Sequence, residues 1–137
     1  MDGRRQKNLV LILAREFASK LAEPMLVTDA DGNLVFYNEP AEDVLGRAFS
    51  EAGELAADRW ASSFHAEAPD GTPMPLEQMP AGIALVERRP ATGVVRFTGL
   101  DGVTRTISVT GIPLFAHRDE FVGAVAIFWE LASGNGG

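Results

Sequence analysis

One segment near the end of the chain limits the possible folds more than any other, because it is apolar on both sides of a β-strand. Phe121–Trp129 contains no charged or hydrogen-bonding side chain except the indole of its last residue. Successive side chains of a strand point to opposite faces of the sheet. Val125 and Ile127 therefore lie on one face, and Ala126 and Phe128 lie on the other. An antiparallel strand of this composition has to be covered on both faces, so the fold needs a layer of structure on each side of its sheet.

The N-terminal segment has the pattern of a helix that can form one of these layers. Residues 5–22 contain an apolar stripe with a four-residue spacing, made of Leu9, Leu13, Phe17 and Leu21. The first half of the segment is apolar nearly all round, and such a helix needs contacts on more than one side. Either the helix packs on its own domain alone, or it also pairs with a second subunit, because soluble proteins avoid large exposed apolar patches. We expect a homodimer whose interface contains Leu9, Leu13, Phe17, Leu21, Val125, Ile127 and Trp129.

A β-hairpin followed by a capped helix is predicted after Pro24. The apolar runs Met25–Thr28 and Leu34–Tyr37 flank an Asp-Gly pair, and Gly allows the positive φ that tight hairpin turns require. Asn38 follows the second run, where its side chain can accept hydrogen bonds from the first backbone N–H groups of a helix. Gly46 suits the end of that helix.

The rest of the chain is predicted as short helices followed by three strands. Residues 47–72 are consistent with one or two short helices, and a further helix spans roughly Pro80–Arg89. Alternation predicts strands over Val94–Thr98 and Thr106–Ile112, which the closing strand follows.

The order of these elements places the chain in the α+β class. We predict one five-stranded antiparallel sheet, with the short helices on one face and the N-terminal helix on the other. The expected organisation is a capping and dimerisation helix in residues 1–22, a domain in residues 23–131 and a flexible tail in residues 132–137.

Three motifs in this order resemble the PAS family of sensor domains, over about Glu23 to Leu131. They are Met25–Asn38 with Ala41-Glu42 and Leu45-Gly46, then Asp70–Pro75 with Pro80–Leu85, then Ile107–Leu114 with Phe121–Ala126. The resemblance implies a sensory or dimerisation module with a small cavity between the sheet and the middle helices. It also implies regulation of an effector on the same chain or on a partner, such as a histidine kinase, phosphatase, cyclase or transcription factor. The chain departs from the family after Trp129, where Glu130-Leu131-Ala132 replace its frequent Asp-hydrophobic-Thr element.

Composition argues against several cofactors and partners. The chain has no cysteine, which removes disulfides, cysteinyl-flavin photochemistry and thioester-linked chromophores. The helix near Pro80–Arg89 has no histidine, whereas the haem-binding members of the family need an axial imidazole there.

The net charge of −7, without a run of Lys or Arg, argues against nucleic acid and anionic membranes. No apolar run approaches the roughly 20 residues of a membrane span. We expect a cytoplasmic protein without haem or a cysteinyl-flavin, and an unknown small ligand stays open as an alternative.

The cavity implied by the resemblance would be lined from the inward faces of the strands and middle helices. Its predicted lining is Trp60, Met79, Ile83, Val95, Phe97, Ile107, Val109 and Phe128, with Arg96 and Tyr37 to orient a polar group. The alternative is that these side chains fill the core, because close packing is the usual state of protein interiors.

A small cone-shaped enzyme of the isomerase type would need a buried acid–base pair, and no inward strand position supplies an acid. No catalytic or metal-ligating set is predicted. We expect a non-catalytic module that regulates an effector such as a histidine kinase or phosphatase domain.

Overall fold

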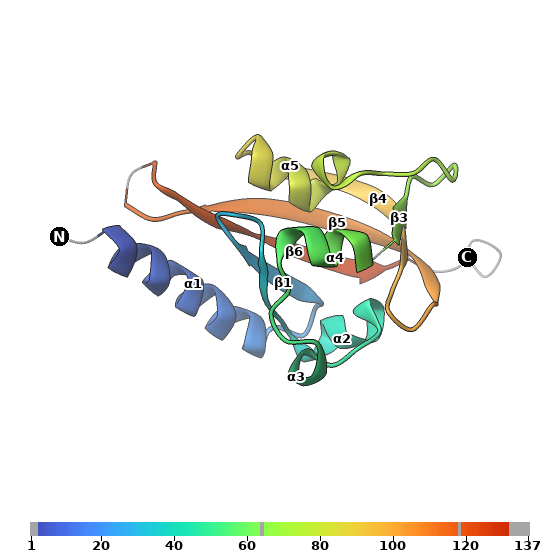
Figure 1. The fold of residues 1–137 in the computed structure, drawn as a ribbon, viewed down its shortest axis with the longest axis horizontal. Helices are drawn as coiled ribbons and strands as arrows, with labels where there is room; N and C mark the ends of the chain where they lie inside the picture. The colour runs from blue at the N-terminus through green and yellow to red at the C-terminus, as the bar shows by residue number, and fades with distance from the viewer. Residues whose placement is uncertain (1–2, 64, 118, 132–137) are drawn as a thin grey trace.

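The computed structural model describes residues 3–63, 65–117 and 119–131, so the predicted tail at 132–137 lies outside the described residues. Figure 1 shows a helix, a pair of strands, a group of short helices with one short strand, and three long strands, in chain order. Their bounds are α1 (Gly3–Lys20), β1 (Met25–Asp29), β2 (Leu34–Tyr37), α2 (Glu39–Leu45), α3 (Phe49–Ala52), α4 (Ala57–Ser63), β3 (His65–Glu67), the 3₁₀ turn η1 (Leu76–Gln78), α5 (Pro80–Val86), β4 (Ala91–Thr98), β5 (Thr104–Phe115) and β6 (Phe121–Glu130).

Within the described residues, six strands form one antiparallel sheet in the order β2-β1-β6-β5-β4-β3. The first strand lies between the second and the last, which is the order that the PAS resemblance implies. The predicted count of five strands is wrong by one. The additional strand, β3, pairs His65–Glu67 with Arg96–Thr98 of β4. Three residues are too few to show an alternating pattern, so this strand is defined by its pairing and not by its own sequence.

Loop segments bridge both edges of the sheet. At β2, Leu34 exchanges two backbone hydrogen bonds with Leu55, of 2.8 and 3.0 Å. At β3, Glu67 forms an antiparallel bridge with Pro73, and the N–H of Met74 donates to the carbonyl of Ala66 at 3.1 Å. Neither edge strand therefore presents its full row of unpaired backbone groups.

The side chains of the sheet pack in two clusters, one on each face. In β1, Leu26 belongs to the cluster that includes residues of α2, α4 and α5, whereas Met25 and Val27 belong to the cluster that includes residues of α1. In β6, Ala126 and Val125 divide in the same way. Figure 1 shows α1 along one face of the sheet and α5 on the other. Strand β6 is consequently buried over most of its length.

Helix α1 contacts the sheet through small side chains. Ala18 is fully buried, and Ala14 and Leu11 are partly buried in the same cluster. Because alanine is short, the helix axis can approach the sheet closely here, and the larger residues on the opposite side of α1 remain outside. None of the described helices combines the length and the apolar character that crossing a membrane requires.

Asn38 and Gly46 delimit α2 as predicted. The side chain of Asn38 accepts a hydrogen bond from the N–H of Ala41, and Gly46 has a left-handed conformation with φ of 86°. In that conformation the N–H of Gly46 donates to the carbonyl of Glu42, which closes the last turn of the helix.

Candidate functional site

A small cavity lies between the sheet and the short helices, at the place that the PAS resemblance implies. Its volume is about 30 Å³, and apolar side chains line it: Leu26, Leu45, Trp60, Met79, Ala81, Phe97, Ile107, Val109, Ala126 and Phe128. About 10–15 Å³ of such cavity space is enough to hold one water molecule, so this cavity has room for about two or three.

The structure brings many of the predicted lining residues together around this cavity. Those that line it are Trp60, Met79, Phe97, Ile107, Val109 and Phe128. Val95 is fully buried in the same cluster without lining the cavity, and Ile83 is only partly buried in α5.

Arg96 is placed away from the cavity. Its position in β4 alternates with Val95 and Phe97, so its side chain lies on the opposite face of the sheet. There the Arg96 guanidinium pairs with the carboxylate of Glu67 at 3.6 Å. The prediction that Arg96 orients a ligand inside this cavity therefore does not fit its position, because a strand alternates faces at every residue.

Tyr37 is buried in the core cluster, but its hydroxyl is engaged outside the cavity lining. The hydroxyl donates to the backbone carbonyl of Arg47 at 2.8 Å. Burial raises the pKa of Tyr37 above its ordinary value of 10.0, and the carboxylate of Glu42 raises it further. Tyr37 thus ties the end of β2 to the segment after α2.

Sequence reasoning missed four lining residues, Leu26, Leu45, Ala81 and Ala126. The alternation of the strands already places Leu26 and Ala126 on the inward face, so that pattern alone identifies them. Leu45 and Ala81 lie in α2 and α5, and helices of seven residues are too short for a periodic pattern to define one face.

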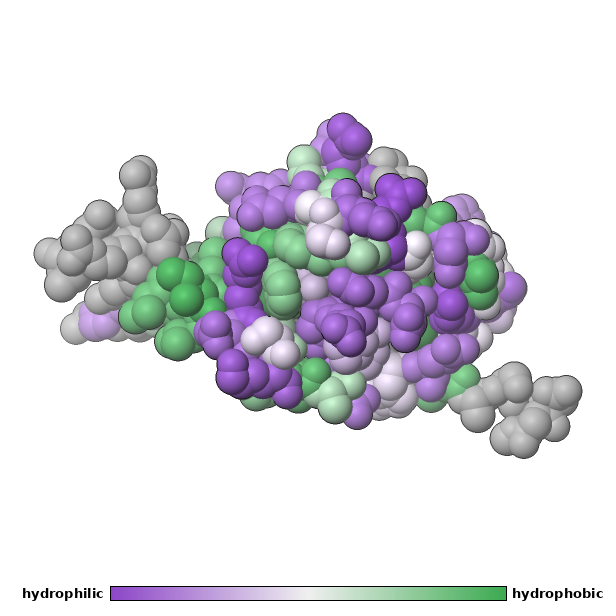
Figure 2. All heavy atoms as spheres, turned by 90° about the horizontal axis from the view of Figure 1, so that it is seen from below, coloured by the Kyte–Doolittle hydropathy of each residue, from purple (hydrophilic) through white to green (hydrophobic). Residues whose placement is uncertain are grey.

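The outward side of α1 is the largest departure from ordinary burial in the described chain. The exposed fractions are 54% for Leu9, 55% for Ile12, 58% for Leu13 and 56% for Phe17. Figure 2 shows hydrophobic side chains gathered on this helix, beside the grey atoms of the N-terminal end. We call Leu9, Ile12, Leu13 and Phe17 the outer stripe. Contiguous exposed apolar surface of this type marks interaction sites in soluble proteins.

The predicted interface residues fall into two groups. Leu9, Leu13 and Phe17 are in the outer stripe, and Trp129 at the end of β6 is 42% exposed. The others pack in the cluster beneath α1, and they are Leu21, Val125 and Ile127. A helix that lies on the sheet necessarily covers this second group.

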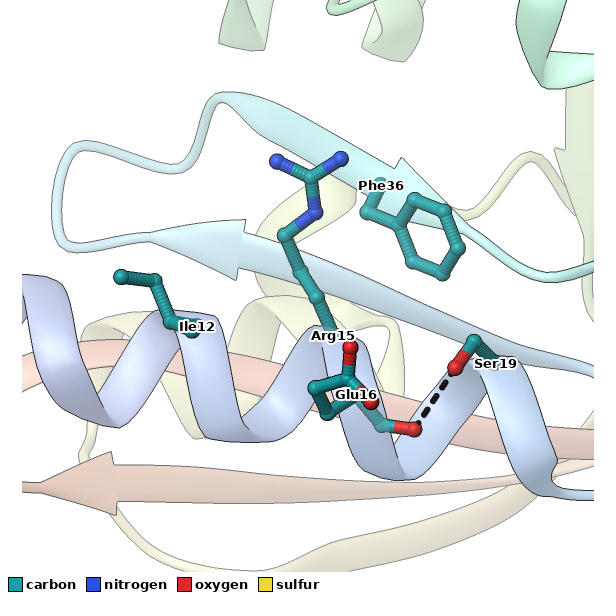
Figure 3. Close-up of a pocket in the computed structure, with 5 residues that line it drawn as sticks. All are labelled: Ile12, Arg15, Glu16, Ser19 and Phe36. Carbon is teal, nitrogen blue, oxygen red and sulfur yellow. Dashed lines mark hydrogen bonds between the residues drawn. The ribbon is translucent and has the colours of Figure 1, made fainter.

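An open groove of about 280 Å³ runs along the flank of α1, beside the outer stripe. Ile12, Arg15, Glu16, Ser19 and Phe36 line it, and Figure 3 shows Arg15 extending from α1 towards Phe36 of β2. The guanidinium carbon of Arg15 lies 5.0 Å from the centre of the Phe36 ring, a distance typical of a cation–π contact. This pair is a direct contact between α1 and strand β2 of the hairpin.

The described residues contain no group of three or more His, Asp or Glu side chains arranged to hold a metal ion.

Comparison with known proteins identifies the fold. No protein-family model and no curated protein sequence matches the chain. Solved structures of PAS and LOV domains do match. One is the PAS domain of nitrogen regulation protein NR(II) from Vibrio parahaemolyticus, with a TM-score of 0.60, 16% identity and coverage of 87% of this chain and 98% of that chain.

Two further matches come from other kinds of protein. The Rhodobacter sphaeroides LOV protein has a TM-score of 0.65 at 18% identity, over 98% of this chain and 71% of that chain. The PAS domain from the fruit-fly ELK potassium channel has a TM-score of 0.66 at 12% identity, over 89% of this chain and 96% of that chain. Similarity at these identities is similarity of fold. Together with β1 between β2 and β6 and the short helices over one face of the sheet, these matches show that the chain has the PAS fold.

Proposed function

We propose that this chain is a cytoplasmic, non-catalytic PAS module of signal transduction that forms a homodimer through α1 and regulates an effector. The effector is a domain such as a histidine kinase or phosphatase, on the same chain or on a partner. The observation that supports this proposal most strongly is the outer stripe of α1, in which four large apolar side chains are each more than half exposed.

A second copy of the chain is the occupant that suits this surface. A twofold dimer places the same patch of each subunit against the other, so an apolar stripe meets an apolar stripe. Two of the nearby charges offset each other, because Glu16 and Lys20 on α1 form an ion pair of 3.0 Å within one subunit. Trp129 supplies further exposed apolar surface at the end of β6.

The matched structures support a signalling role without identifying the output. They include a nitrogen regulation protein, a LOV protein and a potassium channel, which share the domain and differ in the rest of the molecule. A PAS module serves such different proteins when it passes a change in its own state or association to whatever domain is attached.

The size of the core cavity favours an interaction module over a ligand sensor. A volume of about 30 Å³ without a polar lining side chain, apart from the indole N–H of Trp60, offers little to a polar ligand. That N–H already donates to the carbonyl of Gly32 at 2.8 Å. A ligand-binding sensor would require the short helices to move away from the sheet.

Sedimentation velocity of the native chain and of Leu13→Glu and Phe17→Glu tests the homodimer. We expect the native chain to sediment as a dimer at high concentration and each variant to raise the dissociation constant by about thirtyfold or more, because a carboxylate is then buried in an apolar contact. Val86→Glu is the matched control, since Val86 is 68% exposed on α5, across the sheet from α1. A native chain that is monomeric at high concentration, or a Val86→Glu variant that dissociates equally, contradicts the proposal.

A further inference from the structure

Asn38 occupies the point where four segments of the fold meet. It follows β2 and precedes α2, next to the end of α1 and the start of β1. Its side chain is 2% exposed, and Asn38 is one of two buried polar residues among those that the structure describes, the other being Thr28. A buried amide has to satisfy both its acceptor and its donors.

The amide of Asn38 makes four hydrogen bonds, two in each direction. Its oxygen accepts from the backbone N–H of Met25 at 3.0 Å and of Ala41 at 3.1 Å. Its nitrogen donates to the backbone carbonyl of Ala18 at 3.0 Å and of Glu23 at 2.8 Å. The side chain therefore caps the first turn of α2 and, at the same time, the last turn of α1.

Few side chains can cap two helix ends of opposite polarity. The start of a helix has free N–H groups and its end has free carbonyl groups, so the same side chain must accept at α2 and donate at α1. An ionised carboxylate only accepts, an ammonium or guanidinium only donates, and a hydroxyl has one proton to give. Asparagine has both functions on one short planar group, which fits the distances at this junction.

We propose that Asn38 couples α1 to α2, so that displacement of α1 is transmitted to the wall of the core cavity. The carbonyl of Ala18 belongs to α1, whereas Ala41, Val44 and Leu45 of α2 are buried in the core cluster. Leu45 lines the cavity. When α1 leaves its docked position, the amide nitrogen of Asn38 loses the carbonyl of Ala18 and keeps only that of Glu23, which lies outside α1. The amide is then held less firmly against the N–H of Ala41. This coupling goes beyond homodimer formation, because it acts for any partner that moves α1.

Hydrogen–deuterium exchange on the full chain distinguishes the hydrogen bonds that Asn38 donates from those that it accepts. Asn38→Asp retains an acceptor for Met25 and Ala41 but, when ionised, no donor for the carbonyls of Ala18 and Glu23. We expect amide exchange in residues 14–21 to increase about tenfold or more, because the carbonyl of Ala18 in α1 loses its hydrogen bond from this side chain. Exchange in residues 41–45 of α2 should change much less, because its cap is kept.

A second substitution tests transmission without altering Asn38. Leu11→Ala removes packing between α1 and the sheet, while Val86→Ala shortens an exposed apolar side chain on α5, across the sheet from α1. With Asn38 present, Leu11→Ala should raise exchange in both α1 and α2, and Val86→Ala should raise neither appreciably. In the Asn38→Asp background, Leu11→Ala should raise exchange in α1 only.

Two results overturn the proposal. One is unchanged exchange in α1 of Asn38→Asp. The other is a Leu11→Ala variant in which α1 exchanges faster and α2 does not. If Asn38→Asp fails to fold, the Leu11→Ala and Val86→Ala pair in the native background decides alone. Failure of this coupling leaves the homodimer intact, and loss of the homodimer leaves this exchange pattern unaffected.

Discussion

The backbone of Gly111 in β5 lies directly against the carbonyl group of Pro80 at the start of α5, so that a Cβ on Gly111 would overlap the Pro80 oxygen. No side chain other than hydrogen is accommodated at this point. The close approach holds the first turn of α5 on the sheet, and the next residue, Ala81, lines the core cavity. The smallness of the cavity is therefore set in part by a glycine on the sheet.

Gly111→Ala should destabilise the fold. The added methyl group has to push the α5 backbone away from the sheet, and overpacking of this kind costs about 1–3 kcal/mol of the free energy of unfolding. Urea denaturation measures this loss. Gly93→Ala is the matched control, because a Cβ there would make an ordinary 3.6 Å contact with the Pro80 ring. Equal destabilisation by both variants would contradict the role given to Gly111.

Tyr37 should make stability fall at alkaline pH. Its pKa is raised in the folded chain by burial, so above pH 10 the native state holds a proton that the unfolded state has lost. Stability is then complete below about pH 10 and decreases as the pH rises towards the pKa of the folded state. Tyr37→Phe should remove this part of the decrease, measured as the difference in urea midpoint between about pH 9 and about pH 11.

Tyr37 is also the single tyrosine of the chain, so the ultraviolet absorbance of tyrosinate reports its ionisation directly. A midpoint at or below the value of an exposed tyrosine, about pH 10, would show that the phenol is not buried as described.

Trp129 should report the dimer by fluorescence. The chain has two tryptophans, of which Trp60 is 3% exposed and Trp129 is 42% exposed. In Trp60→Phe the emission comes from Trp129 alone, and we expect it to shift to shorter wavelength as the protein concentration rises and Trp129 loses water contact. Trp129→Phe is the control and should show no shift. Dimer formation without a shift in Trp60→Phe would exclude Trp129 from the interface.

The core cavity should hold no organic ligand. Native mass spectrometry of the freshly purified chain should give the mass of the polypeptide alone, and addition of a flavin should add no bound mass, because the cavity of about 30 Å³ is far smaller than that ring system. A reproducible additional mass that is lost on denaturation would contradict this prediction and favour the ligand-sensor alternative.

Much of the fold follows from local chemistry in the sequence. The hairpin, the cap at Asn38 and the end of α2 at Gly46 are each determined by residues within a few positions of one another, and each is found as predicted. Strand β3 is different, because His65–Glu67 is a strand only through its pairing with β4. A segment of three residues is too short to show a periodic pattern, so its pairing with a distant strand cannot be predicted from its own sequence.

The candidate site is predictable to a smaller extent, for a similar reason. Strand alternation finds inward residues such as Ile107 and Val109, but the volume that they enclose depends on how closely α5 approaches the sheet at Gly111. In α1 the four-residue spacing identifies an apolar stripe, whereas the small residue Ala18 determines which side of the helix contacts the sheet. Sequence periodicity does not distinguish these two sides when both are apolar.

The bridges at Leu34–Leu55 and Glu67–Pro73 restrict how the molecule can assemble. Each margin of the sheet has one such bridge, so neither edge offers an uninterrupted row of backbone groups for strand addition. We therefore expect contacts with other molecules to form through the side chains of the helices and of the sheet faces. Side-chain contacts of that kind do not impose a backbone hydrogen-bond register, whereas strand addition does.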